Sequence, residues 1–172
     1  MRRTKTARGK WLRGIACLVL ASSAMARTEA IEWLPLTPDD LQMKSEPKAP
    51  AAPAIYLYRQ VDRDDTEGDE DIYYRIKILT EEGRKYADVQ IPYIKEYESI
   101  RSLQARTIRP DGTIINFDGT VYEKPIVKAR GVKLQAKSFS LPNVDVGSIV
   151  EYRYRHVHTY GYVFDSHWWL SE

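Results

Sequence analysis

The sequence contains one cysteine among its 172 residues, and this Cys17 lies inside a short apolar run near the N-terminus. If that run is removed by processing, the remaining chain has no thiol for disulfides, thiolate metal sites or a cysteine nucleophile. The chain also lacks the ~18–20 consecutive apolar residues that a membrane-spanning helix needs. The sequence therefore excludes cysteine chemistry in the processed protein and predicts no membrane span.

The first 26 residues have the pattern of a secretory signal peptide. Six basic residues come first, the apolar run 15–21 follows, and Ala24 and Ala26 provide the small side chains expected before a cleavage site. Cleavage lowers Lys+Arg from 26 to 20 against 24 Asp+Glu, which gives a net charge of −4. A basic footprint for nucleic acid is therefore absent, and we expect an exported protein, periplasmic or extracellular, in a bacterial envelope.

Residues 27–53 form a predicted lead-in segment. Thr37 can cap a helix, Pro38 suits a first helical position, and Asp39 and Asp40 favour the positive end of the helix dipole. A short helix is expected near 38–43, followed by a Pro/Ala linker up to Pro53. The predicted organisation is a signal peptide (1–26), the lead-in segment (27–53) and one domain (54–172).

From Ala54 onward, short stretches of alternating apolar and polar residues are separated by turn residues. This pattern is typical of an all-β chain, and we predict an antiparallel β-sandwich of about nine short strands. The predicted strands are 55–61, 72–78, 88–93, 99–108, 113–117, 121–128, 132–141, 148–158 and 162–170. Arg109-Pro110-Asp111-Gly112 is a predicted hairpin turn.

The alternation also predicts which side chains face the core. In the second strand, Ile72, Tyr74, Ile76 and Ile78 are expected inside and Tyr73, Arg75 and Lys77 outside. In the eighth strand, Val150, Tyr152 and Tyr154 are expected inside and Glu151, Arg153 and Arg155 outside. The acidic run 62–71 is predicted as a solvated loop, with a cation site as the alternative.

Two histidines are the weak metal candidates. His156 and His158 are two residues apart and share a strand face, so their imidazoles could begin a zinc or copper site, with His167 or Asp165 as a distant third ligand. The alternative is that both are half-buried strand residues beside tyrosines. Because nothing in the sequence brings a third ligand close, we assign no metal and no cofactor.

Other catalytic patterns are missing. No serine lies in a Gly-x-Ser-x-Gly context, no Gly-rich phosphate loop occurs, and the separation of a glycosidase carboxylate pair cannot be read from a sequence. The aromatic content is the remaining signal, because twelve Tyr and four Trp are many for this length. Tyr160, Tyr162, Trp168 and Trp169 could form a docking surface for a neighbouring domain, or a surface that binds a cell-wall glycan or peptide.

Four segments, in this order, resemble one known family. They are Trp33–Thr37, Lys77–Gly83, Ala105–Thr113, which contains "PDGT", and Phe139–Tyr152, which contains "LPNVDVGSIVEY". The family is the bacterial envelope domain called domain of unknown function 3857, and the similarity covers roughly Ala54 to the end. The resemblance implies a β-sandwich that precedes a transglutaminase-like, papain-related core carrying a Cys-His-Asp triad.

This chain departs from that arrangement because no cysteine follows Cys17. The resemblance therefore transfers no catalytic residue, and we expect the chain itself not to be an enzyme. The expected function is a non-catalytic exported sandwich that accompanies a transglutaminase-like core in a longer polypeptide. A stand-alone glycan- or peptide-binding module is the alternative.

Overall fold

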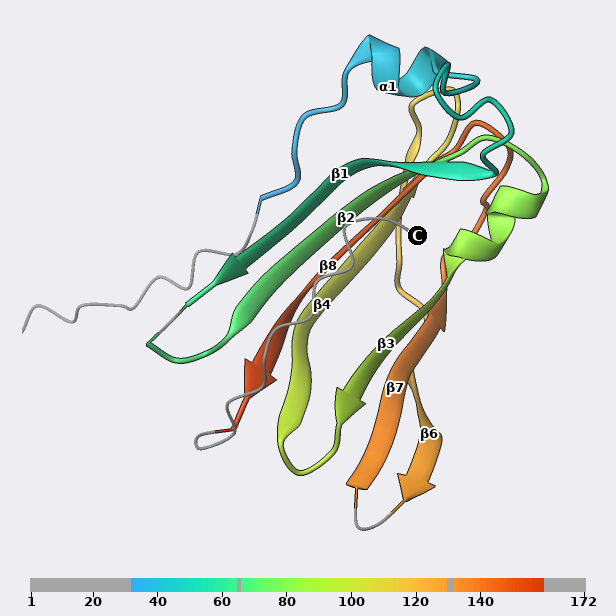
Figure 1. Cartoon of the computed structure of the whole chain (residues 1–172). Helices are drawn as coiled ribbons and strands as arrows, with labels where there is room; N and C mark the ends of the chain where they lie inside the picture. Colours follow the sequence, from blue (N-terminus) through green and yellow to red (C-terminus); the bar gives the residue numbers. More distant parts are fainter. Residues whose placement is uncertain (1–31, 65, 130–131, 160–172) are drawn as a thin grey trace, which may run out of the picture. The chain divides into compact units, whose positions relative to one another are not determined.

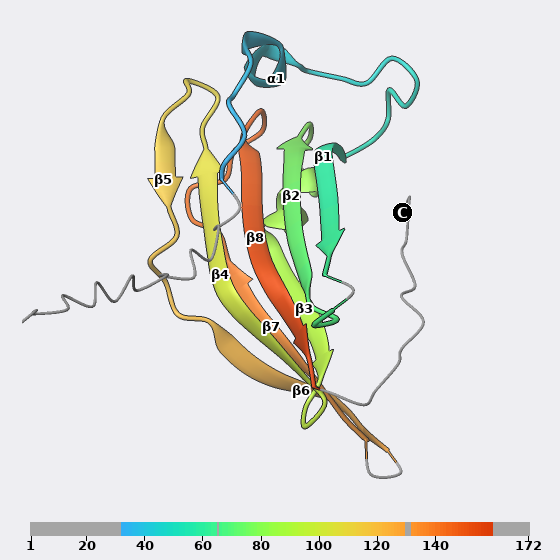
Figure 2. The same ribbon diagram turned by 90° about the vertical axis from the view of Figure 1, so that its left-hand side faces the viewer.

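The computed structural model describes residues 32–64, 66–129 and 132–159. These residues form two antiparallel sheets, shown in two views in Figures 1 and 2. The larger sheet has the strand order β1-β2-β8-β4-β5. Its strands are β1 (Ala54–Arg63), β2 (Glu70–Ile78), β8 (Ile149–His158), β4 (Glu98–Ile108) and β5 (Ile114–Asn116).

The smaller sheet has the order β3-β7-β6, with β3 (Asp88–Ile94), β7 (Val132–Ser140) and β6 (Tyr122–Ala129). A 3₁₀ helix, η1 (Glu82–Ala87), connects β2 to β3. Pro92 lies in β3, an edge strand, where a missing backbone N–H costs no ladder bond to a further strand.

The core is formed by apolar side chains from both sheets. Ile72, Ile76 and Val150 of the larger sheet belong to one buried cluster with Ile91 and Phe139 of the smaller sheet. Two sheets that bury their facing side chains in this way form a sandwich, so the all-β prediction is confirmed.

Eight of the nine predicted strands are present, and the ninth (162–170) lies outside the described residues. The turn at 109–112 is also present. The Arg109 N–H donates to the Thr113 carbonyl at 2.9 Å, and Gly112 adopts a φ of +85°, which glycine tolerates better than other residues.

The prediction that one face of the larger sheet is solvated was wrong. Tyr73 and Lys77 in β2 and Glu151 in β8 have 0% relative exposure, and Arg75 has 4%. The cause is the lead-in segment, which crosses this outer face in Figure 2 and is the blue trace in that view. Alternation in a sequence reports which residues share a face, but it cannot report what covers that face.

The predicted helix is confirmed as α1 (Pro38–Gln42), in which Thr37 and Asp40 form a reciprocal capping box. At the other end of the linker, the Pro53 carbonyl accepts hydrogen bonds from the N–H groups of Leu79 and Thr80 at 2.9 and 3.1 Å. Gly83 permits this approach, because a Cβ at that position would lie 2.0 Å from the same oxygen. No helix among the described residues has the length and apolar character that crossing a membrane requires.

The acidic run is also only partly a loop. Asp62 and Arg63 complete β1, whereas Glu70 and Asp71 begin β2, and Glu70 is 8% exposed. Three carboxylates of the run, Asp62, Glu70 and Asp71, are therefore strand residues, and Glu70 lies buried at the edge of the core.

Candidate functional site

A cluster of charged side chains is buried on the outer face of the larger sheet. We call Tyr73, Arg75, Arg106 and Glu151 the outer-face cluster. Strand register assembles it, because Glu151 in the central strand β8 is paired with Arg75 on β2 and with Arg106 on β4. Arg75 Nε donates to Glu151 Oε1 at 2.5 Å, and Arg106 Nε and the Tyr73 hydroxyl also donate to this carboxylate.

Backbone carbonyls, three of them from the lead-in segment, accept further hydrogen bonds from the buried cations. Arg75 donates to the carbonyls of Leu34 at 2.6 Å and Pro35 at 3.0 Å, so its guanidinium joins the sheet to the lead-in segment. Lys77 Nζ donates to the carbonyls of Leu41 at 2.8 Å and Gly147 at 2.7 Å. These bonds replace the water that both cations lose on burial.

Trp33 covers the cluster. Its ring contacts two guanidinium groups, with Arg106 Cζ 4.4 Å and Arg153 Cζ 4.3 Å from the ring centroid. It also meets Tyr73 edge-on, with centroids 5.6 Å apart. Cation–π contacts of this kind gain strength where water is excluded.

Burial changes the proton affinities in the cluster. Desolvation, reinforced by the neighbouring Glu151 carboxylate, raises the pKa of Tyr73 to about 12. Burial lowers the pKa of Lys77. For Arg75, burial acts in the opposite direction to Glu151, and the carboxylate prevails, so its pKa is raised. The Glu151 carboxylate is occupied by two arginines and a tyrosine, an arrangement suited to stability rather than to proton transfer.

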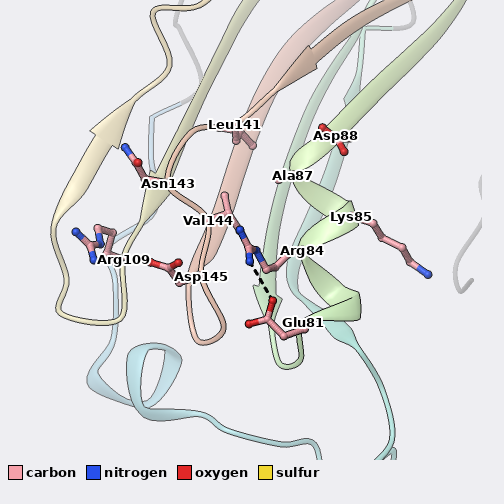
Figure 3. Close-up of a pocket in the computed structure, with 10 residues that line it drawn as sticks. All are labelled: Glu81, Arg84, Lys85, Ala87, Asp88, Arg109, Leu141, Asn143, Val144 and Asp145. Carbon is pink, nitrogen blue, oxygen red and sulfur yellow. Dashed lines mark hydrogen bonds and ion pairs between the residues drawn. The ribbon is translucent and has the colours of Figure 1, made fainter.

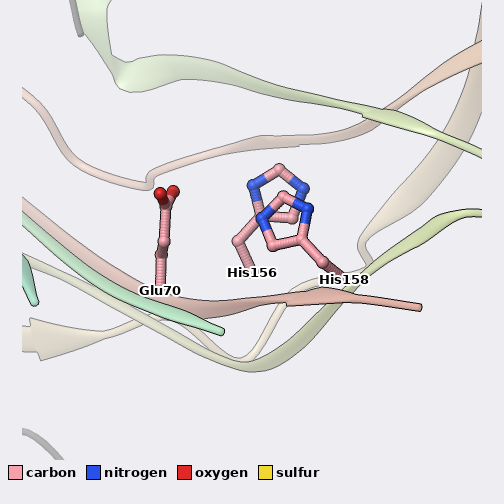
Figure 4. Close-up of side chains that lie close together, drawn as sticks. All are labelled: Glu70, His156 and His158. Carbon is pink, nitrogen blue, oxygen red and sulfur yellow. The ribbon is translucent and has the colours of Figure 1, made fainter. Parts of the chain in front are cut away.

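The second candidate is a group of four side chains on the inner face of the same sheet. We call Glu70, Glu98, His156 and His158 the histidine–glutamate cluster. Register again explains it, because Glu70 on β2 is paired with His156, and Glu98 on β4 is paired with His158. The imidazole rings stack with centroids 4.4 Å apart, and Figure 4 shows them beside the Glu70 carboxylate.

Charged side chains surround the two histidines. Glu98 Oε2 lies 3.2 Å from His156 Nε2, Glu98 Oε1 lies 3.8 Å from His158 Nδ1, and Arg63 Nη1 lies 3.2 Å from Glu70 Oε1. The side chains of His156 and His158 are 16% and 17% exposed. Their Nε2 atoms are buried and make no well-aligned hydrogen bond.

Electrostatics favour an ionised carboxylate beside neutral imidazole. Burial alone would raise the pKa of Glu98, but His156, the Ile94 N–H and His158 together lower it. Burial, with the neighbouring His156, lowers the pKa of His158. Neutral imidazole and ionised carboxylate are the forms that ligate metal ions.

The third candidate is a surface hollow of about 680 Å³ beside η1, shown in Figure 3. Two exposed ion pairs line it, Arg84–Glu81 at 3.0 Å and Arg109–Asp145 at 3.7 Å. Because charges of both signs alternate around it, the hollow offers no selection for a charged ligand. Solvent-exposed ion pairs of this kind contribute little to the stability of the fold.

The structure does not describe the four aromatic residues that the sequence predicts as a docking or ligand surface. Tyr160, Tyr162, Trp168 and Trp169 lie outside the described residues. Among the described tyrosines, Tyr73 and Tyr93 are 0% and 6% exposed. The more exposed ones, Tyr56, Tyr97 and Tyr122, lie on β1, on the β3–β4 turn and on β6, so they do not follow one strand as a continuous strip would.

The sequence therefore identified His156 and His158 as candidate metal ligands, but it gave no indication that Glu70 and Glu98 lie beside them. The acidic run contains Glu70, yet only the β2–β8 register places it beside His156. The outer-face cluster was also missed, although opposite charges at outward positions on three strands were a visible signal.

Comparison with known proteins places this arrangement in a family. The family model of the domain of unknown function DUF3857 matches residues 64–172. A crystal structure of a putative protease from Parabacteroides distasonis is similar with a TM-score of 0.50 and 16% identity, over 64% of this chain and 24% of that one. This chain thus spans about a quarter of that protein, and at such identity the likeness shows the fold alone. A comparison with curated proteins found no match. The sandwich, and the length of the match to the family model, show that the chain belongs to the DUF3857 family.

Proposed function

We propose that this chain is a non-catalytic, exported β-sandwich that accompanies a transglutaminase-like catalytic core. In this proposal the sandwich supplies a rigid neighbour for the core, and the chemistry belongs to the core. The partner is a domain of the same polypeptide, in the bacterial envelope.

The observation that carries the proposal is that the carboxylate of the outer-face cluster is fully buried and fully hydrogen-bonded. Its carboxylate, Glu151, has no exposed surface and accepts hydrogen bonds from Tyr73, Arg75 and Arg106. A general base or nucleophile must reach a substrate, and this carboxylate is covered by the lead-in segment. The most elaborate polar arrangement among the described residues is thus suited to holding the lead-in segment on the sheet.

Two further observations support the proposal. No cysteine follows Cys17, so the processed chain has no thiol nucleophile of its own. The similar crystal structure is of a putative protease, and the match covers 24% of its chain. A sandwich of this type can therefore form one part of a larger protein.

The first experiment is to read the gene beyond codon 172. A continuing frame that encodes a cysteine, then a histidine and an aspartate, as in papain-like cores, is the expected result. The full-length protein would then be assayed for peptide hydrolysis and transamidation, beside a variant with that cysteine changed to serine. A stop codon directly after Glu172, or thiol-independent activity of the 27–172 chain alone, would overturn the proposal.

Export has its own test. We expect the protein recovered from the envelope fraction to begin at Arg27, as determined by N-terminal sequencing. Full-length protein starting at Met1 in the cytosol would contradict it.

The alternative function is a glycan- or peptide-binding module. It stays a prediction for Tyr160, Tyr162, Trp168 and Trp169, and titration of cell-wall glycans and peptides against Trp fluorescence is its test.

A further inference from the structure

We propose that Glu70, His156 and His158 form a three-ligand zinc site at one end of the sandwich core. The two imidazoles come from β8 and the carboxylate from β2, so a bound ion would cross-link two neighbouring strands. This inference is independent of the proposed function, because it needs no catalytic core.

The geometry is the first argument. One candidate ligand atom from each of the three side chains lies within 4.8 Å of the others. Zinc bonds of about 2.0–2.1 Å in a tetrahedral arrangement set ligand atoms about 3.4 Å apart. The ligand atoms must therefore close by about 1.4 Å at most, which rotations about side-chain bonds can supply without moving the strands.

The chemical types of the ligands are the second argument. Two imidazole nitrogens and one carboxylate oxygen suit zinc, whereas magnesium and calcium prefer an all-oxygen shell. With no thiolate present, the site does not require a reducing compartment. Three protein ligands leave the fourth position for water or for a side chain of another domain.

The surroundings are the third argument. The Nε2 atom of His158 is buried and has no hydrogen-bond partner, which is costly unless another group is bound there. Glu98 faces both rings from β4, 3.2 Å from His156 Nε2 and 3.8 Å from His158 Nδ1, and is itself held by the Ile94 N–H at 2.7 Å. A carboxylate anchored in this way can orient a ligating imidazole, so we assign Glu98 as a positioning residue.

The cluster lies close to the protein surface, because the histidine side chains are 16% and 17% exposed. Arg63 Nη1 lies 3.2 Å from Glu70 Oε1, and its positive charge would weaken the binding of a cation.

The experiment uses the chain without a polyhistidine tag, stripped with EDTA and titrated with Zn²⁺ or Mg²⁺ by calorimetry. We expect one Zn²⁺ per chain and no binding of Mg²⁺ at the same concentrations. Glu70→Gln and His156→Gln should each weaken Zn²⁺ binding at least tenfold, and His156→Gln/His158→Gln should abolish it. Glu123→Gln is the matched control, because it removes an exposed carboxylate on β6 and should leave zinc affinity unchanged.

A second readout does not depend on the variants. Co²⁺ in the stripped protein should give the intense visible absorption of a tetrahedral centre, and Zn²⁺ should displace it. Absence of stoichiometric zinc in the unsubstituted protein would overturn the proposal. Full zinc occupancy in the double histidine variant would overturn it equally, because the ion would then lie elsewhere.

Discussion

Replacing Glu151 by glutamine tests whether the outer-face cluster stabilises the fold. The substitution keeps the shape of the side chain and removes its charge. Arg75 and Arg106, which are 4% and 8% exposed, would then be buried beside a neutral amide. Removing one partner of a buried ion pair typically costs about 3–5 kcal/mol, because the remaining charge is left without compensation.

The surroundings set the magnitude within that range. Arg75 keeps the carbonyls of Leu34 and Pro35 and its 3.3 Å contact with Asp40, and Arg106 keeps the ring of Trp33. We therefore expect the lower end, a loss of about 3 kcal/mol in the free energy of unfolding. With a urea m-value of about 2 kcal/mol/M, the unfolding midpoint would fall by about 1.5 M.

The matched control is Glu123→Gln. Glu123 pairs with Lys137 at 2.5 Å, but its side chain is 47% exposed, so its loss should cost less than about 1 kcal/mol. The assay is urea unfolding at pH 7, followed by tryptophan fluorescence and circular dichroism. Equal midpoint shifts for the two variants would refute the reasoning, because the buried carboxylate would then contribute no more than a surface one.

Two further predictions concern the same region. Trp33→Ala removes a half-buried ring that contacts two guanidinium groups, so we expect the free energy of unfolding to fall by about 2 kcal/mol and proteolysis in residues 44–53 to become faster. Unchanged cleavage would mean that the ring does not hold the lead-in segment. Because the pKa of Tyr73 rises from 10.0 to about 12 on folding, the unfolded chain loses this proton first, and stability falls as the pH rises above 10. By pH 11 the free energy of unfolding should have fallen by about 1.4 kcal/mol from this cause. Urea titrations between pH 8 and pH 11 measure the fall, and Tyr73→Phe should not show this contribution. A parallel pH dependence in both proteins would contradict the assignment.

The strands were predicted correctly because their signals, the alternation of residue types and the turn residues, are local in the sequence. In β2 and β8, apolar or aromatic residues alternate with charged residues along most of the strand. The Pro110-Asp111-Gly112 turn contains residues that accept the φ values a turn requires. The exposure prediction failed because it depends on a segment distant in sequence. Arg75 is separated by 41 residues from Leu34, whose carbonyl it binds, and nothing in the local pattern of β2 encodes that contact.

The candidate metal ligands illustrate the same limit. The spacing of His156 and His158 fixes their common face, which the sequence reveals. The third ligand, Glu70, lies 86 positions before His156, in a run whose composition favours a solvated loop. Only the antiparallel register of β2 and β8 brings them together, and register between distant strands is set by the whole core rather than by either strand.

The central strand β8 carries both clusters, Glu151 on its outer face and His156 and His158 on its inner face. His156 follows Glu151 by five positions in extended chain, which is about 16 Å along the strand. Substitutions that far apart usually add within about 0.5 kcal/mol, so Glu151→Gln and Glu70→Gln should be independent in the metal-free protein. The measurement is a double-mutant cycle in urea. A coupling energy above about 1 kcal/mol would mean that β8 transmits strain between its faces, and the two clusters would then have to be treated as one site.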